Sequence, residues 1–336
     1  MSLIDALPEL DSEPSAAFAA RPHNAALDLR RQTAAVRVSF TWFGTRRKVT
    51  SDQRDEMARP FDAESDSISA SKKLVNTKHP QFRALTKIKG QIKAYWEDNS
   101  LPFPEDGVRL IKQSALNDFE ANMGSLRDDL ALAVHALAEH YEELREEAKR
   151  RLGSLFDPGD YPASLDGLFA VSWDYPSVEP PDYLLELNPQ LYEQERQRVT
   201  QRFDEAVRLA EQAFATEFST IVTGLCESLA GRRENGEAKT LKEGAIRSTL
   251  EFFERFKSLR IGDSTALDAL VDQAQDAIRG VSAKALRVNG DVRVTVAEQL
   301  GAVRQQLEAL VVEKPRRRIL RPTPAPEPTN DPVDQP

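Results

Sequence analysis

The segment SALNDFEANMGSLRDDLALAVHALAEHYEELREEAKRRLG, from Ser114 to Gly153, determines the expected fold class. It lacks proline and places an apolar residue at every third or fourth position, which predicts one long amphipathic helix. These residues are Leu116, Phe119, Met123, Leu126, Leu130, Val134, Leu137, Tyr141, Leu144, Ala148 and Leu152. A helix of roughly forty residues is about 60 Å long, so it needs a partner along its length.

A second segment, Pro189–Gly231, predicts a helix of matching length, with Asn188 as its N-cap and Pro189 at its first position. We therefore expect a long antiparallel, coiled-coil-like helical hairpin. The segments Ala35–Phe43 and Leu168–Asp174 alternate apolar and polar residues, as half-buried strands do. Because an isolated strand is rarely stable, we expect them to pair in a small two- to three-stranded β-sheet. The predicted fold class is mainly α.

Shorter helices complete the expected organisation. They are Gln81–Asp98, Thr240–Leu259, Ser264–Arg279 and Asp291–Val312. We divide the chain into a disordered arm (1–28), a basic strand and helix region (29–113), the long helix pair with its inserted strand (114–232), C-terminal helices (233–313) and a disordered tail (314–336). The tail contains seven prolines and begins with KPRRR, which could attract nucleic acid, although we favour a solvated tail.

Composition excludes several protein classes. The net charge is −9, so the whole chain does not resemble a typical nucleic-acid or membrane-surface binder. No apolar run approaches the roughly 18–20 residues of a membrane span, and the start of the chain does not resemble a signal peptide. Cys226 is the single cysteine and cannot form an internal disulfide. We expect a cytoplasmic protein without membrane contact.

The charge is unevenly distributed. Residues 29–96 contain fifteen lysines and arginines against six acidic residues, a net +9, so the rest of the chain carries −18. The ranges 29–51 and 68–96 contain no acidic residue. Basic side chains attract phosphates, and aromatic rings among them can stack on unpaired bases. The candidate nucleic-acid-binding residues are Arg83, Lys87, Lys89, Lys93, Trp96, Phe103, Arg109, Lys112, Arg46, Arg47 and Lys48.

Two alternatives compete with this site. Trp96 and Phe103 could instead cap the helical core, and we weigh this alternative ahead because tryptophan is usually buried. The basic region could also dock on an acidic protein or on the acidic helices of a second copy in a homo-oligomer.

Searches for catalytic motifs find no P-loop, dinucleotide fingerprint, nucleophile elbow or cysteine pair. His135 and His140 are five residues apart, which turns their rings about 140° from each other on one helix, whereas zinc-binding helices use a spacing of four. We therefore predict no catalytic residue, metal site or cofactor.

Several motifs together resemble an uncharacterised family, catalogued as domain of unknown function three-one-five-zero, of phages, plasmids and integrative elements. They are Trp42-Phe43-Gly44 before Arg46-Arg47-Lys48, Leu101-Pro102-Phe103 before Asp106-Gly107 and Arg109-Leu110, and Leu155-Phe156 before Asp160-Tyr161-Pro162. The resemblance covers about residues 35–312. It implies genes near those of a MoxR-type AAA+ ATPase and a von Willebrand A-domain protein, and sometimes near recombination genes.

Two functional hypotheses follow. The first is a non-enzymatic helical scaffold or adaptor of a phage or mobile-element complex, working with protein partners such as the AAA+ ATPase and the von Willebrand A-domain protein. The second is a single-stranded DNA-binding module that uses the basic N-terminal third.

Overall fold

The computed structural model of the chain describes residues 24–230, 242–260 and 265–312. The chain forms two compact units, Met1–Phe214 with Ile246–Val271 and Ala215–Ala245 with Asp272–Pro336. The predicted tail, most of the predicted arm and the start of the helix predicted from Thr240 lie outside the described residues. The domain boundaries that we expected therefore differ from the observed division, in which the C-terminal helices contribute to both units.

The first described element is α1 (Asn24–Gln32), which continues directly into strand β1 (Thr33–Trp42). Our prediction of a disordered arm was wrong for residues 24–28, because Ala26 and Leu29 of α1 are buried in a hydrophobic cluster. Burial of one face thus fixes a short helix whose composition alone suggested an arm.

A four-stranded antiparallel sheet organises the first unit. Its strand order is β4 (Leu101–Pro102), β5 (Val108–Lys112), β1 and β6 (Phe169–Asp174). The predicted pairing of β1 with β6 is confirmed, with Val38 opposite Trp173 and Phe40 opposite Val171. The sheet is larger than predicted because β5 pairs with the other edge of β1.

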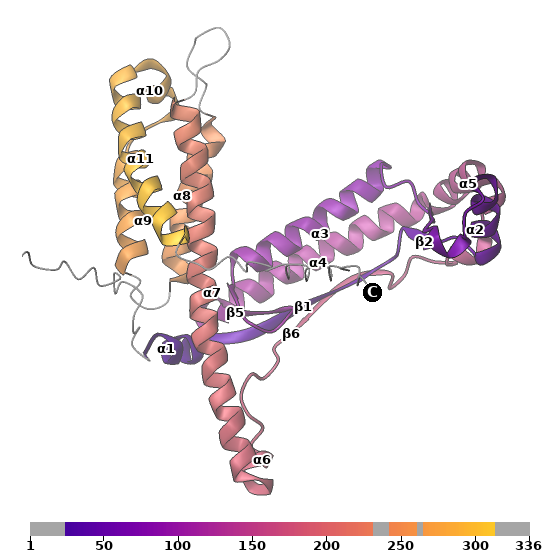
Figure 1. The fold of residues 1–336 in the computed structure, drawn as a ribbon, viewed down its shortest axis with the longest axis horizontal. Coiled ribbons are helices and arrows are strands. Elements are labelled where there is room, and N and C mark those ends of the chain that lie inside the picture. Colours follow the sequence, from indigo (N-terminus) through magenta and orange to yellow (C-terminus); the bar gives the residue numbers. More distant parts are fainter. Residues whose placement is uncertain (1–23, 231–241, 261–264, 313–336) are drawn as a thin grey trace, which may run out of the picture. The chain divides into compact units, whose positions relative to one another are not determined.

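Helices cover both faces of the sheet (Figure 1). On one face, Val36, Val38 and Ile111 pack with α3 (Pro80–Asp98) and α4 (Leu116–Glu139). On the other face, Ala35 and Leu110 pack with α7 (Pro189–Ala230). The N-cap predicted at Asn188 is confirmed, since its Oδ1 accepts a hydrogen bond of 3.1 Å from the backbone nitrogen of Leu191.

The long helix predicted from Ser114 to Gly153 is divided into α4 and α5 (Tyr141–Leu152). The division falls at His140, whose φ and ψ are −102° and 5°. The expected pairing of this segment with Pro189–Gly231 in an antiparallel hairpin is not confirmed. Instead α4 lies along α3 and contacts β6, as Figure 1 shows.

A smaller two-stranded sheet lies beside these elements, formed by β2 (Arg46–Lys48) and β3 (Ser71–Lys73). Helix α2 (Ser51–Ala58) lies between the two strands in the chain. Lys72 of β3 is buried and forms an ion pair of 2.6 Å with Asp160. Short 3-10 turns occur at Arg59–Phe61, Ser65–Ser67, Gln113–Ala115, Gly153–Leu155 and Pro158–Asp160.

The remaining helices are α6 (Tyr183–Leu187), α8 (Glu243–Leu259), α9 (Thr265–Ile278), α10 (Ala283–Val288) and α11 (Gly290–Val312). The last two belong to the second unit, where Arg293 donates hydrogen bonds of 2.8 Å to the carbonyls of Leu229 and Ser228. Cys226 is buried, and burial raises the pKa of its thiol. Within the described residues, no helix combines the length and apolar character needed to cross a membrane.

Candidate nucleic-acid interface

An open cleft of about 690 Å³ lies where the end of β1 meets the first turns of α3. Its lining comes from the two ranges of the basic region that contain no acidic residue, 29–51 and 68–96. The lining residues are Trp42, Phe43, Gly44, Thr45, Thr77, Phe82, Arg83, Thr86, Lys87 and Lys89. The cleft thus combines three cations with aromatic rings and contains no carboxylate in its lining.

Phe169 of β6 holds the aromatic side of the cleft in place. The Trp42 ring meets it edge-on with centroids 5.0 Å apart, and the rings of Phe43 and Phe82 each lie 6.3 Å from it. Such edge-to-face pairs add stability beyond the burial of their area. Trp42 and Phe43 remain partly accessible because β1 ends at this point.

The Lys89 side chain extends from α3 to the aromatic rings at the end of β1. Its Nζ atom lies 4.0 Å from the Trp42 ring centroid and 5.2 Å from that of Phe40. The ring faces attract the ammonium electrostatically, while partial burial lowers the pKa of Lys89. The positive charge is therefore held at the wall of the cleft.

Arg83 and Lys87 are exposed and lie one helical turn apart on α3. Among the described residues, neither side chain takes part in an ion pair. One turn beyond Lys89, Lys93 lies 3.6 Å from Glu97 and is partly neutralised. The cleft cations are thus the ones best placed to meet an external anion.

The predicted cations of β2 continue from the cleft, because Arg46 follows the lining residue Thr45 directly. Arg46 and Lys48 are exposed, and Arg47 lies 3.9 Å from Asp160. Pairing with β3 fixes this strand, and the backbone nitrogen of Leu74 donates a hydrogen bond of 2.9 Å to the carbonyl of Thr45.

Four predicted site residues have structural roles instead. Trp96 is 9% exposed and Phe103 is 7% exposed, so neither ring can stack on a ligand at the surface. Phe103 packs on Phe203 of α7 with ring centroids 5.5 Å apart. The site prediction was thus wrong for both aromatic residues, and the alternative that they belong to the core describes them correctly.

Arg109 and Lys112 lie on β5, and both side chains form hydrogen bonds within the protein. Arg109 donates hydrogen bonds to Ser100 Oγ (2.8 Å) and to the Ser100 carbonyl (2.7 Å), and burial lowers the pKa of its guanidinium group. The Lys112 ammonium donates to the carbonyl of Arg260 at 3.1 Å. Both were expected at the nucleic-acid site, and the structure places them in contacts that hold the sheet to its neighbours.

Trp42 and Phe43, the partly exposed aromatic residues of the cleft lining, were not among the predicted site residues. The signal that could have identified them is their position immediately before Gly44 and the basic Arg46-Arg47-Lys48. Here the aromatic residues end β1, a short turn and the basic strand β2 follow, and both rings remain partly accessible.

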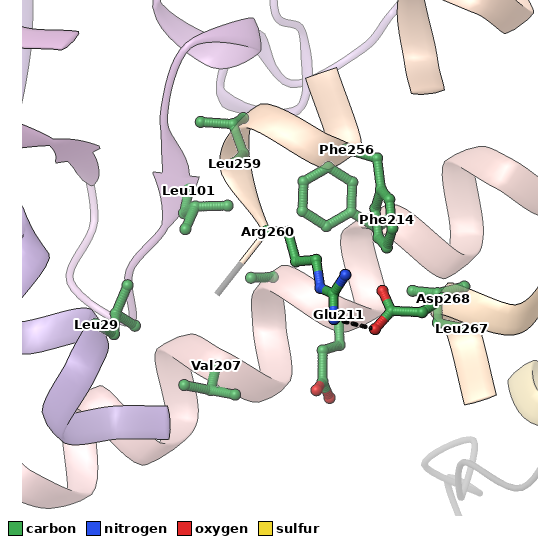
Figure 2. Close-up of a pocket in the computed structure, with 11 residues that line it drawn as sticks. Leu29, Leu101, Val207, Glu211, Phe214, Phe256, Leu259, Arg260, Leu267 and Asp268 are labelled. Atoms are coloured by element: carbon green, nitrogen blue, oxygen red, sulfur yellow. Dashed lines mark ion pairs between the residues drawn. The ribbon is translucent and has the colours of Figure 1, made fainter. Parts of the chain in front are cut away.

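A second cavity, lined mainly by apolar side chains, has a volume of about 30 Å³ (Figure 2). Figure 2 shows the Arg260 guanidinium facing Asp268, with an ion-pair distance of 2.8 Å, beside Phe214 and Phe256. One water molecule needs at least about 10–15 Å³ of such volume, so the cavity could hold one or two waters at most. It is too small for a substrate larger than water.

No family model, no curated protein and no solved structure matches the chain.

Proposed function

We propose that this protein is a non-enzymatic binding protein that holds single-stranded nucleic acid in the cleft between β1 and α3. The observation that carries the proposal is the cleft lining itself, which places Arg83, Lys87 and Lys89 beside Trp42 and Phe43 without an acidic residue. Cationic grooves with aromatic platforms are the common design of proteins that bind single strands without base readout.

The two kinds of side chain have separate tasks. Arg83 and Lys87 neutralise phosphates, which releases counterions and makes binding dependent on salt. An unpaired base stacks on Trp42 in place of the Lys89 ammonium, and the displaced lysine contacts the neighbouring phosphate. A duplex offers no free base face, so single strands bind more tightly.

The resemblance to a mobile-element family, some of whose genes lie near recombination genes, favours DNA as the strand. The single cysteine favours action in the cytoplasm, where thiols stay reduced.

Fluorescence anisotropy with labelled oligothymidylate of about 16 nucleotides, near the upper site size of one binding domain, tests the proposal. The variant Arg83→Glu with Lys87→Glu should lose most of its affinity at low salt. The matched control, Arg247→Glu with Lys257→Glu, changes the same charge at exposed positions of α8 and should bind like the wild type. Equal weakening by both double variants would show that only net charge matters and would refute the cleft.

We also propose a second function, docking of a protein partner, because one end of the first unit carries exposed apolar side chains. Tyr183, Leu185, Leu187 and Leu191 lie on α6 and the first turn of α7, and Leu187 is 77% exposed. Exposed apolar groups this close together typically mark interaction surfaces. This surface supports the adaptor hypothesis better than the helical hairpin, which is not confirmed.

The family resemblance suggests the MoxR-type AAA+ ATPase and the von Willebrand A-domain protein as candidates for this partner. Co-purification with a co-expressed copy of each tests the docking. Leu185→Asp with Leu187→Asp should abolish recovery of the partner, whereas Leu132→Asp, at a 70% exposed position of α4, should not. Recovery that is unchanged by the double variant would remove this surface from consideration.

A further inference from the structure

His140, at the junction of α4 and α5, faces His79 at the start of α3. The centroids of the two imidazole rings are 5.4 Å apart. His79 occupies the N-cap position before Pro80, and the break in the helix at His140 turns its ring towards α3. Two histidines separated by 61 positions in the chain are thus brought together by the fold.

Glu143 completes a cluster of three metal-binding side chains. Its Oε2 atom lies 3.3 Å from Nδ1 of His140. One nitrogen or oxygen atom from each of His79, His140 and Glu143 lies within 4.8 Å of the others. Two ligand atoms at about 2.0–2.1 Å from a tetrahedral ion are about 3.3 Å apart, so one edge of the site already has the required spacing.

His79 gives the second, independent observation. Its Nδ1 atom is buried and has no hydrogen-bond partner among the described residues. Buried polar atoms without partners are rare in folded proteins and call for an explanation such as an unseen ion. A metal ion bound through this nitrogen would supply the missing partner.

We infer that His79, His140 and Glu143 bind one divalent transition-metal ion of the zinc class. Two imidazoles and one carboxylate are a ligand set that zinc proteins use, whereas magnesium and calcium prefer oxygen ligands. The ion ties the start of α3 to the junction of α4 and α5. None of its ligands lines the nucleic-acid cleft, so this inference is independent of the proposed function.

His135, which sequence reasoning paired with His140, is not part of this site. It is exposed and lies 3.8 Å from Glu139 on the same helix. The spacing argument considered only residues of one helix, so it could not detect His79, which lies at the start of α3.

The test uses the untagged full-length chain after treatment with a chelator. Zn²⁺ titration by calorimetry should give one ion per chain, and Co²⁺ should produce the visible absorption of a low-coordinate site. Loss of one ligand should weaken binding by more than about tenfold, because even changes in the surrounding shell cost 10- to 100-fold. His140→Ala and Glu143→Gln should both show this loss. Glu143 is exposed, so its variant should fold normally.

The matched control is His135→Ala, which removes an exposed histidine of α4 and should bind Zn²⁺ like the wild type. Absence of Zn²⁺ binding by the wild type would overturn the inference. Unchanged affinity in His140→Ala and Glu143→Gln, with circular dichroism showing a folded protein, would also overturn it.

Discussion

The ammonium group of Lys89 lies 4.0 Å from the centre of the Trp42 ring, so two residues 47 positions apart in the chain, one on a helix and one on a strand, share a cation–π contact. This contact places a cation, which can neutralise a phosphate, beside an aromatic ring, on which an unpaired base can stack. It also closes one side of a cleft whose other cations face solvent.

Removal of the indole should weaken binding through lost stacking. We expect Trp42→Ala to lower the affinity for oligothymidylate by about 1–3 kcal/mol, which corresponds to about fivefold to 150-fold in Kd. Trp96→Phe should bind like the wild type because Trp96 is buried in the core. Anisotropy titrations of both variants check this, and a larger loss for Trp96→Phe would contradict the assignment of the stacking residue.

Removal of the Lys89 charge should change the salt dependence of nucleic-acid binding. For single strands, each phosphate contact contributes roughly −0.7 to the slope of log affinity against log salt. Lys89→Gln should therefore make the slope shallower by about 0.7 if one contact is lost. Titrations at several salt concentrations measure it, and a slope equal to that of the wild type would place Lys89 outside the interface.

The buried ion pair between Lys72 and Asp160 should stabilise the β2–β3 sheet. The Lys72 side chain is only 5% exposed, and it also donates a hydrogen bond of 2.8 Å to the carbonyl of Leu155. Removing one partner of a buried pair typically costs about 3–5 kcal/mol, so Lys72→Met should lower the free energy of unfolding by about this amount.

Urea denaturation measures the effect of Lys72→Met. The control Lys73→Met changes the exposed neighbour and should stay within about 0.5 kcal/mol of the wild type. Equal stability of the two variants would show that the buried ammonium contributes nothing.

The Tyr161 hydroxyl should make stability fall at alkaline pH. It donates a hydrogen bond of 3.0 Å to the carbonyl of Leu74, and burial raises its pKa. A folded pKa above the unfolded value of about 10 gives stability that is fully present below pH 10 and is lost as the pH rises through the folded pKa. The loss should be smaller in Tyr161→Phe, which cannot ionise.

Denaturation at pH 8 and near pH 11 compares the two proteins. The wild type keeps some pH dependence from other tyrosines, since burial also raises the pKa of Tyr95 and Tyr141. An identical decrease in the wild type and in Tyr161→Phe would contradict the role of this hydroxyl.

Local patterns predicted most single elements correctly. Val36, Val38, Phe40 and Trp42 alternate with polar residues, and they lie on the sheet face that packs on α3 and α4. By contrast, β5 was missed because its five residues include consecutive apolar ones and end next to a helix, so no alternation marks them as a strand. The break between α4 and α5 at His140 was also missed. The apolar residues keep their helical spacing across it, because the break changes the backbone conformation and not the sequence pattern.

Partners in space could not be predicted from spacing. The apolar seam of Leu116–Glu139 indicated that a partner was needed, but any helix with a complementary face could fill this role, and α3 does. The basic residues of α3 were predicted to be at the site. The position of Trp42 in the cleft could not be predicted, because it follows from β1 ending beside those residues in the fold. Likewise, only the folded chain reveals that His79 approaches His140.

The central claim is that single-stranded nucleic acid lies in the cleft between β1 and α3. Ultraviolet crosslinking to oligothymidylate, followed by mass spectrometry of the digested protein, locates the contact directly. We predict crosslinked peptides that contain Trp42 or Phe43, and loss of these crosslinks in Arg83→Glu with Lys87→Glu. Crosslinks confined to the basic KPRRR segment at residues 314–318, with none at Trp42 or Phe43, would contradict the account.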